Sequence, residues 1–231
     1  MGQVTADRQR HKAVVFDLDG TLIDSAPDIA AAVNKVVGKL ADRSLSVAYV
    51  ESFIGDGSRS MLRRIFADNS IEADPQFLET QLAAYLQHYH AEPVVRTRFY
   101  PHVKEDLLTL QAAGFQLGVC TNKPHELTKL VLQELGIASL FDAVCGADAV
   151  DHRKPHPEHL LAVVRQLGLA PEEILYVGDT EIDRACAHDA DIAFFIVNWG
   201  GGLRMADGAD TRIGRLSDLL AYGQVPEVSR R

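Results

Sequence analysis

Ala13-Val14-Val15-Phe16-Asp17-Leu18-Asp19-Gly20-Thr21 is the stretch of this sequence that decides the fold. An apolar run of strand length leads directly into two aspartates, a glycine and a threonine. A strand that is apolar on both faces is typical of a parallel sheet buried between two layers of helices. The polar residues that follow it would then lie at the carboxyl end of that strand, where open α/β sheets bind their ligands.

Further apolar runs of strand length follow along the chain: residues 116–120, 141–145, 174–177 and 192–197. Most of the stretches between them have a helical pattern with a proline near its start and a glycine at its end: Pro101 and Gly114, Pro124 and Gly136, Pro157 and Gly168. This placement is typical of helix termini. Strands that alternate with helices predict an α/β fold with a Rossmann-like, doubly wound parallel sheet.

One long stretch departs from this alternation, because residues 24–94 contain helical patterns and no convincing strand. A capping-box pattern, Ser25-Ala26-Pro27-Asp28, opens the first of these helices, and Asp74-Pro75 opens another. We therefore predict a Rossmann-like catalytic core of residues 1–23 and 95–231. A helical cap domain of residues 24–94 is inserted after its first strand.

Length, composition and charge restrict the class of protein. The 231 residues suffice for such a core with an insertion, and the net charge of −9 argues against a nucleic-acid partner, which requires a basic surface. No segment reaches the ~20 apolar residues of a membrane span, and the polar start lacks the apolar core of a signal peptide. We expect a cytoplasmic protein with no membrane partner, whose cysteines are buried core residues: Cys120, Cys145 and Cys186. The oligomeric state stays open.

Polar segments lie near the ends of three other predicted strands. They are Thr121-Asn122-Lys123, Lys154-Pro155 and Gly178-Asp179-Thr180-Glu181-Ile182-Asp183. Each segment alone could be a turn or a helix cap. Because the carboxyl ends of parallel strands meet at one edge of a sheet, we expect these side chains to converge there. The combination favours a catalytic site over turn chemistry.

This set of groups suits transfer of a phosphoryl group to a carboxylate. Asp17 is the candidate nucleophile, which would form an aspartyl-phosphate intermediate. Asp19, two residues further on, would protonate the leaving alkoxide and later deprotonate the attacking water. Lys154 would offset the charge of the nucleophile and of the phosphoryl oxygens. Thr121 and Asn122 are the candidates for binding those oxygens.

A divalent cation is expected beside the nucleophile, because Mg²⁺ prefers hard oxygen ligands. Asp17, Asp179 and the backbone carbonyl of Asp19 are the candidate ligands. Asp183 lies four residues beyond Asp179 and could hold a metal-bound water. The predicted cofactor is Mg²⁺.

These polar segments, in this order, resemble the four motifs of the haloacid dehalogenase-like hydrolase superfamily, over residues 12 to about 213. The resemblance implies a Rossmann-like core with a helical cap. Asp19 resembles the residue that phosphatases and phosphomutases of the superfamily carry and that dehalogenases lack. The chain is most similar to phosphoglycolate phosphatases, because Gly55-Asp56-Gly57 and Phe99-Tyr100-Pro101-His102-Val103 look like segments of those enzymes.

The cap is where we expect substrate selection. Gly55 and Gly57 would let a loop approach a small ligand closely, and Arg59 or Arg64 could meet a carboxylate on it. Solvated positions on a helix are the alternative interpretation of both arginines.

The predicted function is therefore a Mg²⁺-dependent phosphatase that hydrolyses a small phosphate monoester, similar to phosphoglycolate, through an aspartyl-phosphate. Its partner would be a small phosphorylated metabolite. A phosphomutase similar to β-phosphoglucomutases is the first alternative, since the core motifs do not distinguish the two. A catalytically silent binding protein on the same fold is the second.

Overall fold

A single six-stranded sheet forms the centre of the computed structural model, which describes residues 11–206, 208 and 210–223. Its strands are ordered β5-β4-β1-β6-β7-β8, and every pair is parallel. They span Ala13–Phe16 (β1), Gln116–Cys120 (β4), Ala143–Cys145 (β5), Ile174–Gly178 (β6), Ala193–Val197 (β7) and Thr211–Ile213 (β8). The predicted α/β class with a parallel sheet is confirmed.

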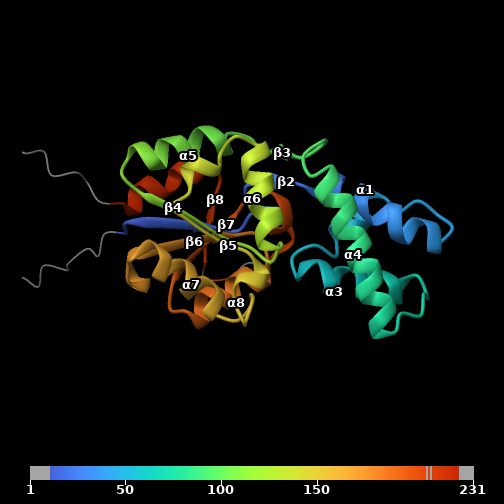
Figure 1. Cartoon of the computed structure of the whole chain (residues 1–231). Helices are drawn as coiled ribbons and strands as arrows, with labels where there is room; N and C mark the ends of the chain where they lie inside the picture. Colours follow the sequence, from blue (N-terminus) through green and yellow to red (C-terminus); the bar gives the residue numbers. More distant parts are fainter. Residues whose placement is uncertain (1–10, 207, 209, 224–231) are drawn as a thin grey trace, which may run out of the picture.

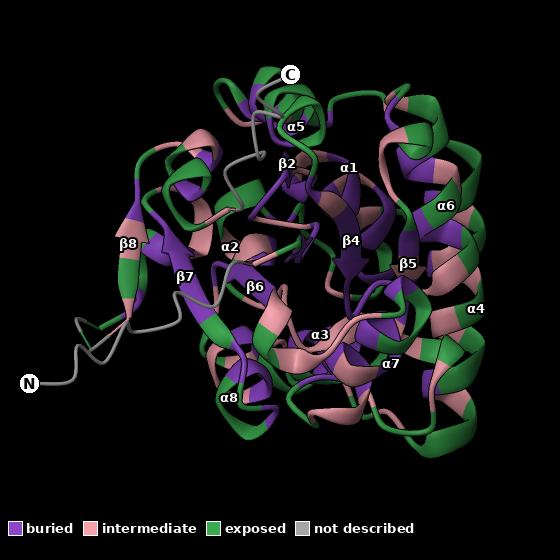
Figure 2. Cartoon of the chain, turned by 90° about the vertical axis from the view of Figure 1, so that its left-hand side faces the viewer, coloured by how far each residue is buried: buried purple, intermediate pink, exposed green. Residues whose placement is uncertain are grey.

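Helices cover both faces of this sheet (Figure 1). They are α5 (Val103–Ala112) and α6 (His125–Glu134) on one face, and α7 (Glu158–Leu167) and α8 (Glu181–Asp189) on the other. Val14 and Phe16 belong to the apolar core under α5 and α6, and Ala13 and Val15 to the core under α7 and α8. Side chains of successive strand residues point to opposite faces, so a strand covered on both sides is apolar throughout. Figure 2 shows the strands buried along most of their length.

The stretch between β2 (Ile23–Asp24) and β3 (Arg98–Phe99) is helical and contains no strand among its residues, all of which are described. It holds α1 (Ala26–Val33), a π-helical segment (Asn34–Gly38), α2 (Val47–Glu51), α3 (Gly57–Asp68) and α4 (Pro75–Ala91). Figure 1 shows α1, α3 and α4 to one side of the sheet. On this basis we propose that residues 24–94 form a helical cap and that residues 1–23 and 95–231 form the core.

Two neighbouring segments connect the helical insertion to the sheet. Strands β2 and β3 pair antiparallel, so the outgoing and returning connections lie side by side. The buried Asp28 carboxylate accepts hydrogen bonds from the backbone N–H groups of residues 95–97 and, at 2.8 Å, from the Thr97 hydroxyl. Asp28 thus fixes the returning segment to helix α1.

The capping box expected at residues 25–28 was a wrong prediction. Ser25 makes no side-chain capping bond, and its hydroxyl donates instead to Oδ1 of Asp19 at 2.5 Å. Asp28, the other half of the pattern, is occupied by the returning segment. The side chains of Ser25 and Asp28 thus bond to groups outside the helix and do not cap its first turn.

None of the helices in the described part of the chain is both long enough and apolar enough to span a membrane. The three cysteines are free thiols, and all of them are buried, as expected from the sequence: Cys120, Cys145 and Cys186.

Candidate active site

Three neighbouring strands bring the predicted site residues to one edge of the sheet. Asp17 directly follows the central strand β1, Thr121 follows β4 on one side, and Asp179 follows β6 on the other. The Asp17 N–H still donates to the carbonyl of Val177 at 2.9 Å, so the parallel hydrogen-bond ladder holds the start of this loop. The sheet itself therefore sets the positions of these side chains.

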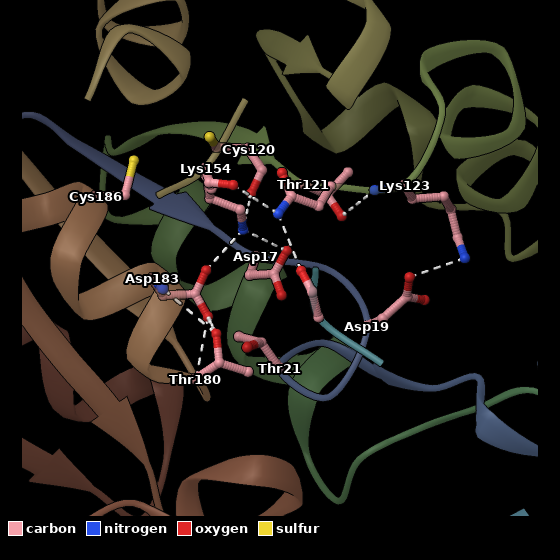
Figure 3. Close-up of polar contacts among 12 residues, drawn as sticks. Asp17, Asp19, Thr21, Cys120, Thr121, Lys123, Lys154, Thr180, Asp183 and Cys186 are labelled. Atoms are coloured by element: carbon pink, nitrogen blue, oxygen red, sulfur yellow. Dashed lines mark hydrogen bonds and ion pairs between the residues drawn. The ribbon is translucent and has the colours of Figure 1, made fainter. Parts of the chain in front are cut away.

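The ammonium of Lys154 joins the carboxylates at this edge (Figure 3). Its Nζ lies 2.8 Å from Oδ1 of Asp17 and 2.7 Å from Oδ1 of Asp183, and it donates to the carbonyl of Cys120 and the hydroxyl of Tyr176. The side chain is 1% exposed. Burial alone would lower the pKa of Lys154, but Asp17 and Asp183 raise it well above its usual value. Lys154 is thus a fixed positive charge.

Asp17 lies in a buried environment that opposes its charge. The pKa of Asp17 is raised to about 6. Burial is the largest cause, the nearby Lys154 lowers the pKa, and Asp183 raises it. A carboxylate with this pKa is largely ionised at neutral pH and is weakly stabilised by hydration. Both properties suit a nucleophile.

Asp179 has no cationic partner among the described residues. The Thr21 hydroxyl donates to its Oδ1 at 3.1 Å and the Gly201 N–H to its Oδ2 at 2.8 Å. Burial, followed by the charges of Asp183 and Asp17, raises the pKa of Asp179 well above its usual value. Carboxylate oxygens of these three aspartates lie within 4.8 Å of one another. A buried carboxylate without a compensating cation in an oxygen-rich cluster fits a divalent metal ion.

Asp183 has donors at both carboxylate oxygens. Oδ1 receives bonds from Lys154 and from the Tyr176 hydroxyl at 2.9 Å, and Oδ2 receives the Thr180 hydroxyl at 2.6 Å and two backbone N–H groups. Burial would raise the pKa of Asp183, but Lys154 and these donors lower it. This saturation favours an indirect role beside a metal rather than direct ligation.

One glycine of the first motif is required by the close approach of Asp179. Gly20 has φ +91, and a Cβ there would lie 2.1 Å from Oδ2 of Asp179. Only a residue without a side chain fits this conformation and this contact.

A cavity lies over this edge of the sheet, between the strand ends and the helical insertion. Its core lining consists of Asp17, Asp19, Thr121, Asn122 and Lys123. Its cap lining consists of Ile29, Ile54, Gly55, Gly57, Ser58, Met61 and Tyr85. The structure thus brings both predicted cap glycines to the predicted catalytic residues.

Asn122 connects the core to the cap loop at this cavity. Its side-chain N–H₂ donates to the carbonyls of Gly55 and Lys154, both at 3.0 Å, and its Oδ1 is buried without a partner. Gly57 lies beside it, because a Cβ there would be 3.3 Å from the Asn122 carbonyl. Asn122 therefore holds this loop against the core.

The two candidate arginines, Arg59 and Arg64, lie outside the lining of this cavity. Arg59 forms an exposed pair with Glu79, and Nη2 donates to Oε2 at 2.8 Å. The Arg64 guanidinium stacks over the Phe53 ring, 5.0 Å from its centroid. Helix α3 contributes Ser58 and Met61 to the cavity lining instead.

Three contacts of the site were missed from the sequence. Lys123 pairs with Asp19 at 2.9 Å, Tyr176 bridges Lys154 and Asp183, and Gly201 donates to Asp179. Lys123 stands in the quoted Thr-Asn-Lys segment, so its position at a strand end was the available signal. Tyr176 carries a hydroxyl in the middle of an otherwise apolar strand, which is a weaker indication of a site residue.

Known proteins resemble this chain over most of its length. The profile of the haloacid dehalogenase-like hydrolase family matches residues 14–197. A phosphoglycolate phosphatase of Cereibacter sphaeroides is 38% identical over 187 residues, covering 81% of this chain and 85% of the relative. One from Aquifex aeolicus is 35% identical over 209 residues, covering 90% and 95%. The crystal structure of a predicted phosphoglycolate phosphatase from Haemophilus somnus superposes with a TM-score of 0.81 at 30% identity, covering 91% and 97%.

Proposed function

The chain belongs to the haloacid dehalogenase-like hydrolase family, and on this basis we propose that it is a Mg²⁺-dependent phosphatase. Its substrate is a small phosphate monoester similar to 2-phosphoglycolate, hydrolysed through an aspartyl-phosphate. The observation that carries the proposal is the position of Asp17. This carboxylate lies 2.8 Å from the Lys154 ammonium and lines the cavity between core and cap.

In the first step, a carboxylate oxygen of Asp17 attacks phosphorus and the ester P–O bond breaks. We assign the attack to Oδ2, because Lys154 binds Oδ1. The leaving alkoxide takes a proton from the carboxyl group of Asp19. Thr121 lines the same cavity and can donate its hydroxyl to a phosphoryl oxygen, while Lys154 offsets the charge that develops.

In the second step, water attacks phosphorus, and Asp19 accepts the proton that the water loses. The P–O bond to Asp17 breaks, which regenerates the carboxylate and releases inorganic phosphate. The Asp19 carboxyl is held for both steps by the Ser25 hydroxyl at 2.5 Å and by Lys123 at 2.9 Å. Its side chain is 12% exposed, so it faces the cavity without being open to bulk water.

Mg²⁺ is the proposed cofactor, and Asp17, Asp179 and the backbone carbonyl of Asp19 would hold it. When bound, it supplies positive charge that neutralises the phosphoryl oxygens and the crowded carboxylates. Asp183, whose oxygens already accept protein hydrogen bonds, would hold a metal-bound water.

The test is phosphate release from a panel of small monoesters, with Mg²⁺ and with EDTA. We expect Mg²⁺-dependent turnover of 2-phosphoglycolate, and a loss of at least 10³-fold in kcat for Asp17→Asn. Asp189→Asn, an exposed position at the end of α8, is the matched control. An Asp17→Asn protein as active as the parent would refute the proposal. Isomerised sugar phosphate with little free phosphate would instead identify a mutase.

A further inference from the structure

Building on the proposed phosphatase function, we propose that Lys123 selects the substrate by binding a carboxylate on the alcohol part of the ester. The substrate class would then be phosphate monoesters of small hydroxy acids, which carry a second anionic group. This assignment replaces Arg59 and Arg64, which lie outside the cavity.

Lys123 is a buried ammonium with an unused donor. Its side chain is 3% exposed, and its Nζ lies 2.9 Å from Oδ2 of Asp19 and 2.9 Å from the hydroxyl of Tyr89. Figure 3 shows Lys123 reaching toward Asp19, on the side away from Asp183. An ammonium has three N–H donors, and within the described part of the chain these two contacts are its polar partners. One N–H is therefore left for a ligand.

Charge in the cavity makes Lys123 necessary for an anionic leaving group. The lining carries two aspartates, Asp17 and Asp19, and Lys123 is the one Lys or Arg among the described lining residues. Lys154 does not line the cavity, and its ammonium is already bound by Asp17, Asp183 and the Cys120 carbonyl. Without Lys123, the described lining would offer a substrate carboxylate no Lys or Arg to pair with.

The position of Lys123 limits the length of the acid. In the proposed reaction Asp19 contacts the ester oxygen that leaves, and Lys123 contacts Asp19. The Asp19 carboxyl group alone thus separates the Lys123 ammonium from the leaving ester oxygen. This arrangement suits an acid in which one or two carbons separate the carboxylate from that oxygen. Ile54 and Met61 of the cap supply an apolar wall for those carbons.

The cap holds this core lysine in place. Tyr89 of α4 accepts a hydrogen bond from Lys123 and also places its ring 4.5 Å from the ammonium. A cation over an aromatic face is attracted by the ring. Tyr89 is itself buried and stays uncharged, so it orients the ammonium without replacing a substrate carboxylate as its anionic partner.

The experiment compares 2-phosphoglycolate with 2-phosphoglycolamide, a neutral isostere, in the parent and in Lys123→Met. We expect Lys123→Met to lower kcat/KM for the acid on the order of 100-fold more than for the amide, since a hydrogen bond between charged groups is lost. Lys123→Arg, which keeps the charge, should retain more of the preference than Lys123→Met. Lys129→Met, at an exposed pair with Glu126, is the matched control.

An equal fall for both substrates would overturn the proposal, because it would mean that Lys123 only positions Asp19. A parent enzyme that hydrolyses the amide as well as the acid would overturn it without any variant at Lys123. Titration calorimetry with the Asp17→Asn protein gives a readout that needs no turnover: equal affinity for acid and amide would also refute it. Absence of hydrolysis together with tighter binding of the acid would refute the proposed function and leave the carboxylate site supported.

Discussion

Replacing Lys154 with methionine removes the central positive charge of the site while keeping a side chain of similar length. In the parent, this ammonium donates hydrogen bonds to Asp17 at 2.8 Å, to Asp183 at 2.7 Å and to the Cys120 carbonyl at 2.8 Å. The variant leaves two buried carboxylates facing each other without a cation.

The expected cost follows from these contacts. Removing one partner of a buried ion pair costs about 3–5 kcal/mol, because the remaining charge is uncompensated. Here two carboxylates are left, but Asp17 has a pKa of about 6 and can take up a proton at modest cost. We therefore expect the free energy of unfolding to fall by about 4 kcal/mol at pH 7, and by less at pH 5.

Urea titration of the metal-free protein, followed by circular dichroism, measures this loss. With an m-value of about 2–3 kcal/mol/M, the midpoint should decrease by about 1.5 M at an unchanged slope. The Lys129 side chain is 53% exposed beside Glu126, so Lys129→Met should change the free energy of unfolding by at most about 0.5 kcal/mol. Adding Asp183→Asn to Lys154→Met should recover at least about 1 kcal/mol, because it removes one of the unpaired charges.

A loss below about 1 kcal/mol in Lys154→Met, at the same m-value, would refute the reasoning. It would mean that the ammonium pays a desolvation cost as large as its attraction to the two carboxylates. Failure of Asp183→Asn to recover any stability would show that repulsion between the carboxylates is not the cause of the loss.

Three further changes test other parts of the structure. Burial and a nearby lysine ammonium lower the pKa of His159 to about 4. The neutral imidazole therefore contributes stability that is complete above pH 6.5 and is lost as the pH falls toward 4. Between pH 7 and pH 5, the free energy of unfolding measured by urea titration should fall by about 2 kcal/mol less in His159→Gln than in the parent. Gly20→Ala would place a Cβ against Asp179 and should lower kcat at least about 100-fold, measured by phosphate release. Asp28→Asn removes acceptors from the backbone of the returning segment and should cost about 2–4 kcal/mol by urea titration, with faster amide exchange in that segment.

The strands of the sheet were predictable where they are apolar throughout. The runs at β1 and β4 match the structure residue for residue, Ala13–Phe16 and Gln116–Cys120. Strand β8 escaped prediction because Thr211–Ile213 is short and contains one buried residue, Ile213. An edge strand covered on fewer sides leaves a weaker hydrophobic pattern.

The cap residues were the least predictable part of the site. A glycine-rich loop indicated that residues 55–57 approach a ligand, and Gly55 and Gly57 do line the cavity. Arg59 and Arg64 do not line this cavity, because the side chains of α3 that meet it depend on how the helical insertion packs on the sheet. Lys123, in a core motif, is the lysine that lines the cavity instead.

The sequence by itself determined the strand ends and their order, and so which polar groups share the edge of the sheet with Asp17. Parallel strands align their carboxyl ends whatever the details of packing, so this information is local. The tertiary structure alone decided the partners: Lys154 against Asp183, Ser25 against Asp19, and a cap tyrosine against Lys123. Two of those contacts join residues about thirty positions apart in the chain, and a buried charge pairs with whichever group the packing brings within hydrogen-bond distance.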